Sequence, residues 1–300
     1  NVRYQINNSS SFKASFTQNY QYIHLASFGS VSLPTDVWVP STDKVKPQFS
    51  TQYAVGYFKN LKKNTFETSV ELYYKTMENL IEYREGVTPD QDVKNNADNN
   101  FVFGKGDSYG AEFFLKKNEG KLTGWVGYTL SYTNRQFAEI NFGNEFPAKY
   151  DRRHDCSIVL NYQKSKKWTF GAVWVYSTGD ALTLPSQKYF VSSTPPVSVG
   201  ANGQIDLNNN FNVLSLYQER NSFRQKAYHR LDISATLTGK KHKHYEGSWV
   251  FSIYNVYSRK NPYFIYFNVD GNSVDGNLSV QAKQVSLFGM IPSVTYNFKF

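Results

Sequence analysis

The chain ends in Val294-Thr295-Tyr296-Asn297-Phe298-Lys299-Phe300, and this segment gives the clearest indication of the fold. Large apolar side chains occupy every second position, and polar side chains lie between them. Successive side chains of a β-strand point to opposite faces, so this alternation predicts a strand with one apolar face and one polar face. An edge strand of a soluble sheet would show the same pattern, and the rest of the chain has to decide between the two.

The same alternation recurs along the chain, and helical periodicity is nearly absent. The clearest rows start at Phe66, Cys156, Trp168 and Leu231, and each is about ten residues long, which suits a tilted membrane-spanning strand. Eleven strands are expected, near residues 1–7, 11–21, 49–59, 65–78, 106–117, 121–133, 153–163, 167–178, 227–238, 247–257 and 282–300.

The connections between these strands alternate in length. The short ones cover residues 8–10, 60–64, 118–120, 163–166 and 238–246. The long ones lie near residues 22–48, 79–105, 134–152, 179–226 and 258–281. Short periplasmic turns and long extracellular loops are typical of outer-membrane barrels. The sequence therefore predicts an all-β fold, a transmembrane antiparallel β-barrel.

Composition favours the same class. The chain contains 23 Tyr, 23 Phe and 5 Trp, and such rings line both membrane interfaces of a barrel. The mean hydropathy of −0.54 suits a barrel with a polar lumen. The net charge of +9 is concentrated in short turns rather than on one stripe, which argues against nucleic acid. Solvation of the turns, or contact with anionic lipid heads, explains it better.

Strand parity bears on how much of a barrel is present. Bacterial single-chain barrels have an even number of strands, so both ends lie on the periplasmic side. With eleven strands and a descending last strand, Asn1 is expected at the extracellular side, and about half of the barrel is expected upstream. Residues 261–267 are a possible twelfth strand, which would undo this argument.

Several motifs resemble one family of outer-membrane proteins, the SusC-like and carboxypeptidase-regulatory-domain TonB-dependent receptors of the Bacteroidetes type. The resemblance runs in order over essentially the whole chain and is specific only as a set. Its motifs are Leu33-Pro34-Thr35-Asp36-Val37-Trp38-Val39-Pro40-Ser41, Tyr109-Gly110-Ala111-Glu112, Leu122-Thr123-Gly124-Trp125, Tyr150-Asp151-Arg152-Arg153-His154-Asp155, Tyr228-His229-Arg230-Leu231-Asp232 and Ile253-Tyr254-Asn255-Val256-Tyr257, with Arg259-Lys260-Asn261-Pro262-Tyr263 after the last.

The resemblance implies a 22-stranded barrel in the bacterial outer membrane, with residues 1–300 as the C-terminal part of its wall. The plug domain and the TonB-binding segment are absent from this sequence, and TonB would act through that missing part. A SusD-type surface lipoprotein is a further possible partner, and no cofactor is expected. Tyr296, Phe298 and Phe300 resemble the terminal signal that the barrel-assembly machinery recognises. The alternative function is a non-transporting scaffold subunit of an outer-membrane complex.

Two groups of residues are candidates for function. Tyr150, Asp151, Arg152, Arg153, His154 and Asp155 are expected to form a charged network at the extracellular rim, with both arginines paired to carboxylates; a solvated loop end is the alternative. Aromatic residues of the long loops are possible ligand contacts, although loops packing on one another would use them equally. These are Tyr22, His24, Trp38, Tyr189 and Tyr217.

Catalytic and metal sites are not expected. His154 would point away from Asp155 and Ser157, because neighbouring strand residues face opposite sides, so a hydrolytic triad cannot form there. His242 and His244 lie among lysines that would repel a cation. Cys156, the single cysteine, is expected to face lipid as inert packing.

Overall fold

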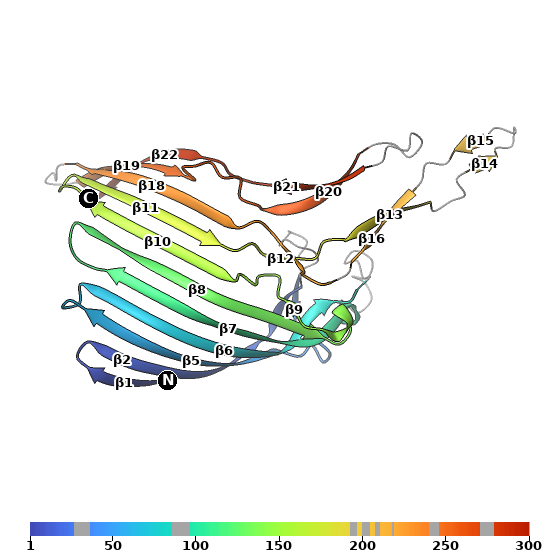
Figure 1. Cartoon of the computed structure of the whole chain (residues 1–300), viewed down its shortest axis with the longest axis horizontal. Helices are drawn as coiled ribbons and strands as arrows, with labels where there is room; N and C mark the ends of the chain where they lie inside the picture. Colours follow the sequence, from blue (N-terminus) through green and yellow to red (C-terminus); the bar gives the residue numbers. More distant parts are fainter. Residues whose placement is uncertain are drawn as a thin grey trace.

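The computed structural model describes residues 1–26, 37–85, 97–192, 197–199, 205–207, 211–217, 219–239, 246–270 and 279–299. Eleven antiparallel strands lie side by side in one curved wall, in the order β1-β2-β5-β6-β7-β8-β10-β11-β18-β19-β22, and β9 (Phe146–Pro147) adds a short pairing to β8 (Figure 1). The strands of the wall are β1 (Val2–Asn7), β2 (Ser10–Gln21), β5 (Gln48–Leu61), β6 (Phe66–Tyr83), β7 (Phe101–Lys117), β8 (Leu122–Phe137), β10 (His154–Gln163), β11 (Trp168–Ser177), β18 (Tyr228–Thr238), β19 (Glu246–Tyr254) and β22 (Ile291–Lys299).

The register between strands gathers the apolar side chains on one face of the wall. Directly paired residues share a face, and one line of such pairs crosses eight strands from β1 to β11. Its members are Tyr4, Phe12, Tyr57, Val70, Phe113, Tyr128, Cys156 and Tyr176. A second line, Phe170, Ala235, Phe251 and Val294, continues the same face to β22.

This face is suited to lipid rather than water. Val294 and Phe298 are 61% and 60% exposed, and large apolar side chains of every wall strand are exposed as well. A continuous exposed apolar surface of this extent is stable only against another apolar phase. The opposite face carries Ser293, Thr295 and Asn297 on β22 and comparable polar residues on the other strands, as the lumen of a barrel requires.

The two ends of the wall differ as the sequence predicts. The short turns lie together at the end where the C-terminus is found, and the long connections lie at the other end (Figure 1). Most of the long connections contain small hairpins rather than bare loops. These pair β3 (Ile23–Ala26) with β4 (Val37–Pro40), β12 (Ala181–Leu182) with β17 (Phe223–Arg224), β13 (Gln187–Ser192) with β16 (Phe211–Leu216), β14 (Val197–Val199) with β15 (Ile205–Leu207), and β20 (Phe264–Asp270) with β21 (Ser279–Val285).

The expected last strand, 282–300, is wrong at its start. Residues up to Val285 belong to β21, and only Ile291–Lys299 pairs with the wall, on β19. The alternation fails between them, where Leu287 and Phe288 are adjacent and Gly289 follows. The possible twelfth strand at 261–267 is largely β20, which pairs with β21 outside the wall, so it adds no wall strand.

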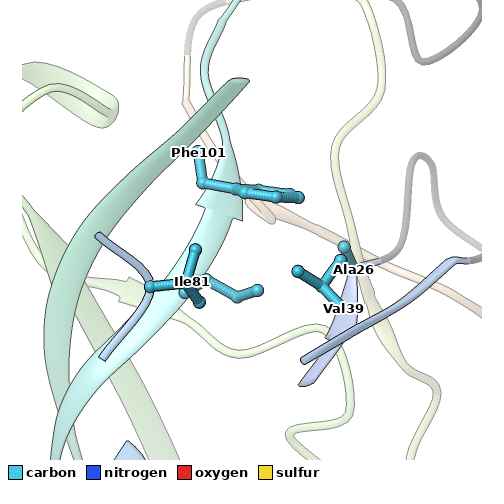
Figure 2. Packing of buried hydrophobic residues seen from close by; sticks show 5 residues of the cluster. Ala26, Val39, Ile81 and Phe101 are labelled. Atoms are coloured by element: carbon cyan, nitrogen blue, oxygen red, sulfur yellow. The ribbon is translucent and has the colours of Figure 1, made fainter. Parts of the chain in front are cut away.

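Small cores lie at the extracellular ends of the longest strands. One unites Ala26, Val39, Val45, Ile81 and Phe101, so the β3–β4 hairpin packs against the ends of β6 and β7 (Figure 2). The other consists of Leu80, Val102, Phe137, Ile140 and Phe146. Two short 3-10 turns, Ala97–Asn100 and Asn141–Gly143, lie beside these cores. No helix in the described ranges is long and apolar enough to cross a membrane.

Candidate functional site at the extracellular rim

Asp151 is the centre of the rim cluster. Its side chain is 1% exposed and accepts ion pairs from Arg224 and, at 3.6 Å, from Arg153. Its second oxygen accepts a hydrogen bond from the backbone N–H of Thr133 at 2.8 Å. Arg224 also donates to the backbone carbonyl of Asp151. A carboxylate so deeply buried is stable only with such partners, and here they join β8, the rim segment and β17.

Arg152 extends this cluster to the start of the β11–β18 connection. Its Nε lies 2.8 Å from the carboxylate of Asp180. The hydrogen bond to Asp180 raises the pKa of Arg152 above its ordinary value. Asp180 lies at the start of the β11–β18 connection and Arg224 lies near its end. Residues 150–155, the rim segment, therefore bind both the outgoing and the returning parts of this connection, which are its two legs.

The remaining residues of the predicted network are placed differently. Tyr150 is 54% exposed, with Lys149 over its ring. His154 begins β10 in the outward row, and its Nδ1 lies 2.8 Å from the hydroxyl of Tyr128. Asp155 follows in the inward row. Among the described residues, the ion pairs of this segment are made by Asp151, Arg152 and Arg153 only.

A second charged cluster lies on the lumen side and was not predicted. The carboxylate of Glu82 on β6 forms ion pairs with Arg135 of β8 at 2.7 Å and with Arg220 of the β11–β18 connection at 3.2 Å. The carboxylate is 14% exposed. Arg135 continues the inward row of Ser131 and Thr133, which is the only sequence signal that could have suggested it.

The turn that carries Arg220 is fixed by further hydrogen bonds. The backbone N–H of Arg220 donates to Asn141 at 3.1 Å, and the side chain of Asn221 donates to the carbonyl of Pro147 at 2.9 Å. Asn221 is buried and has a φ of 51°, a left-handed conformation that Asn tolerates. The returning leg of the long connection is therefore docked on the rim at several points.

The hairpin β3–β4 corrects one predicted ligand contact. Phe101, against which it packs, continues the outward row of β7, so the hairpin lies against the outer side of the wall. His24 is fully buried there and presents no ring surface to a ligand. Tyr22 and Trp38 are 61% and 63% exposed on the same hairpin.

The surroundings of His24 disfavour its charged form. Its Nε2 lies 3.0 Å from the hydroxyl of Ser41, which itself donates to the carbonyl of Tyr22. Its Nδ1 is buried and has no partner among the described residues. Burial lowers the pKa of His24 below its ordinary value of 6.5, because a buried imidazolium loses its solvation.

The other predicted residues lie apart from the charged clusters. Tyr189 on β13 and Tyr217 after β16 are exposed, on a hairpin that extends away from the wall (Figure 1). Tyr296 and Phe298 of the terminal signal lie in the outward row of β22, where Tyr296 contacts Trp249. Phe300, the motif residues 33–36, and His242 and His244 lie outside the described residues.

The charged groups of the rim position the long connection against the wall. Its carboxylates are neutralised by arginines and join the long connection to the wall. In the part of the chain that the structure describes, no group of three or more His, Cys, Asp or Glu side chains is arranged to hold a metal ion. Fold and rim together define a class, the wall of an outer-membrane β-barrel with its extracellular connections clasped by ion pairs.

Comparison with known proteins gives the family. The model of the family described as "TonB dependent receptor-like, beta-barrel" matches residues 1–256, and the chain belongs to this family. It is accordingly a protein of the bacterial outer membrane. The narrower SusC-like assignment does not follow from this match. No curated protein matches the chain in sequence.

Solved structures show the same fold at low identity. The ferripyoverdine receptor of Pseudomonas aeruginosa is 14% identical with a TM-score of 0.53, over 99% of this chain and 32% of that chain. The FrpB iron transporter of Neisseria meningitidis is 13% identical with a TM-score of 0.54, over 99% and 38%. The ferric yersiniabactin uptake receptor of Yersinia pestis is 13% identical with a TM-score of 0.54, and the match covers 99% of this chain and 36% of that chain. This chain spans about a third of the length of these receptors.

Proposed function

We propose that this chain is the C-terminal part of the wall of an active outer-membrane transporter, which takes up a ligand with energy delivered by TonB. The single observation that carries the proposal is the family membership of residues 1–256. TonB would act through a plug domain inside the barrel. The barrel-assembly machinery would recognise the terminal strand through Tyr296, Phe298 and Phe300.

The rim supports a role in ligand entry. Arg220 and Arg224, on the returning leg of the β11–β18 connection, are bound to Glu82 and Asp151 respectively. The connection is thus tied at the lumen entrance, where a ligand has to pass. These ion pairs, which we call the rim clasp, would hold the β11–β18 connection in one position while a ligand is bound.

The character of the lumen supports a ligand class. The inward rows contain many neutral hydrogen-bonding side chains, such as Ser293, Thr295 and Asn297 on β22 and Ser131 and Thr133 on β8, and charged side chains lie among them on other strands. Hydroxyl and amide groups bind sugars and peptides by hydrogen bonding without demanding charge. A glycan or peptide ligand, and a SusD-type lipoprotein over the mouth, would agree with the SusC-like motifs.

Growth experiments test this function. Strains lacking this protein, or lacking TonB, would be grown with single oligosaccharides, peptides or ferric chelates as the limiting nutrient. Both strains are expected to lose growth on the same nutrient, and re-expression of the protein should restore it. If the protein's loss instead weakened the envelope while uptake of every nutrient continued, the protein would be a scaffold and the proposal would be wrong. If only ferric chelates were affected, the ligand class would be wrong.

A further inference from the structure

A groove lies on the lipid-facing side of the wall, at the extracellular end of β11 and β18. It consists of two adjoining hollows that share His229 and Tyr257. The lower hollow, of about 480 Å³, is aromatic and is lined also by Trp174 and Tyr176. The upper hollow, of about 590 Å³, is basic and is lined also by Lys226, Arg259, Lys260 and Gln284.

The height of the groove follows from the length of β11. Its ten residues rise about 3.3 Å each, and a tilt of about 40° makes the strand span roughly 25 Å, which is the height of the apolar band of a barrel. Trp168 is at the end with the short turns, and Tyr176, paired with His229, is at the other end. The aromatic hollow therefore lies at the outer membrane interface, and the basic hollow lies among the headgroups.

The basic hollow is built on a rigid frame. The side chain of Asn261 bonds to both backbone groups of His229, at 3.0 Å each. The hydroxyl of Tyr257 lies 2.8 Å from Nδ1 of His229. Asn255, which is fully buried, accepts a hydrogen bond from the N–H of Arg259 and donates one to its carbonyl. The backbone of Arg259 is thereby held in place before any ligand arrives.

The cations of the hollow make no ion pair within the described residues. In the described part of the chain, no carboxylate forms an ion pair with Lys226, Arg259 or Lys260, and the nearby Asp232 is paired with Arg230 in the inward row. Arg259 donates one bond to the carbonyl of Ala227, but its Nε is buried without a partner in the described ranges.

We propose that the groove binds a phosphorylated glycolipid of the outer leaflet. Lys226, Arg259 and Lys260 would contact the phosphate, since ammonium and guanidinium groups bind phosphate by charge-assisted hydrogen bonds. The sugar would lie over Tyr257 and His229. The acyl chains would follow Trp174 and Tyr176 into the membrane. A lipid fits better than a free anion because the basic hollow opens directly onto an aromatic hollow in the lipid-facing row.

The experiment uses the full-length protein, extracted from its own outer membrane and stripped of lipid in detergent. Native mass spectrometry would measure retention of bis-phosphorylated lipid A, of the same lipid with both phosphates removed, and of bis-phosphorylated lipid A in the presence of excess inorganic phosphate. The phosphorylated lipid is expected to be retained about tenfold better than the dephosphorylated one, and inorganic phosphate should not displace it. The readout is independent of transport.

Matched variants locate the site. Lys226→Gln/Lys260→Gln is expected to lose most of the preference for the phosphorylated lipid, because two of the three cations that line the hollow are removed and only Arg259 remains. Lys164→Gln/Lys166→Gln removes the same charge from exposed positions at the short turn of the β10–β11 hairpin and should keep the preference. Equal retention of the two lipids, equal behaviour of the two variants, or full displacement by inorganic phosphate would each overturn the proposal. If the first variant failed to assemble, the wild-type comparison with dephosphorylated lipid would still decide.

Discussion

The change Asp151→Asn tests the rim clasp most directly. Asparagine has nearly the same shape and can still accept the hydrogen bond from the N–H of Thr133 through its amide oxygen. What it removes is the negative charge that Arg224 and Arg153 share. The two arginines would then lie against a neutral, buried group, and the returning leg of the β11–β18 connection would lose its main attachment to the wall.

The size of the effect follows from burial. Breaking a fully buried ion pair by removing one partner costs about 3–5 kcal/mol. The side chain of Asp151 is 1% exposed, but Arg224 and Arg153 are 33% and 36% exposed and regain part of their solvation. We therefore expect a loss of about 2 kcal/mol in the free energy that holds the connection closed, which corresponds to opening about thirtyfold more often.

Limited proteolysis of the connection measures this opening. When the connection opens and closes faster than it is cut, the cleavage rate follows the population of the open form, so cleavage between residues 179 and 226 should be about thirtyfold faster in the variant. The wall itself should keep its heat-modifiable migration on gels. The wild-type protein and the variant would be digested at the same protein and salt concentrations, because salt screens exposed charges.

Asp270→Asn provides the matched control. Asp270 is paired with Lys283 at 3.8 Å, and the two side chains are 53% and 43% exposed, so their pair contributes little. Its removal should leave cleavage between 179 and 226 unchanged. If Asp151→Asn gave the same cleavage rate as the control, the claim that this carboxylate fastens the connection would be refuted.

Three further predictions concern the connection, the outer hairpin and the wall. Gly179→Ala should accelerate the same cleavage, because an added Cβ would lie 1.8 Å from the carbonyl oxygen of Gln225 and force the β12–β17 pairing apart; an unchanged rate would show that this close approach is not needed. The β3–β4 hairpin should loosen as the pH falls below about 6.5. The folded pKa of His24 is lowered, so its contribution is fully present above the unfolded pKa and is lost as the pH falls toward the folded one. Hydrogen exchange at Leu25, corrected for the intrinsic pH dependence, measures it, and a His24→Gln variant should lose the effect. Single cysteines along residues 66–75, introduced after Cys156→Ser, should react with a water-soluble thiol reagent at every second position, and uniform labelling would contradict the barrel wall.

The wall could be predicted because its signal is local. Side-chain direction in a strand depends only on the backbone of that strand, so rows such as the one starting at Phe66 reveal both the strand and its faces. The alternation of short turns and long connections gave the order of the wall and its two ends. Seven of the eleven wall strands lie within three residues of their expected bounds at both ends. Strands β6, β7 and β8 extend four or five residues further toward the extracellular side, and β22 begins nine residues later than expected.

The candidate site could be predicted only in part. The sequence led us to expect a charged network over Tyr150–Asp155, and its role at the rim stays a prediction; in the structure Arg152 pairs with the carboxylate of Asp180. The sequence offered no means of finding Arg224 as the main partner of Asp151, because 73 residues separate them. Nor did it show that His24 would be buried beneath its hairpin.

The β-barrel wall, its apolar and polar faces and the ends at which the turns and long connections lie can all be read from the sequence, because strand periodicity and turn length are properties of neighbouring residues. Three features depend on contacts between distant segments: which charges meet at the rim, the pairing of β21 with β20 apart from the last strand, and the groove that aromatic and basic side chains from β11, β18 and the segment after β19 share. Glu82 and Arg220 are 138 residues apart, and a contact at that separation exists only after the intervening strands have curved the wall and brought the loop back onto it.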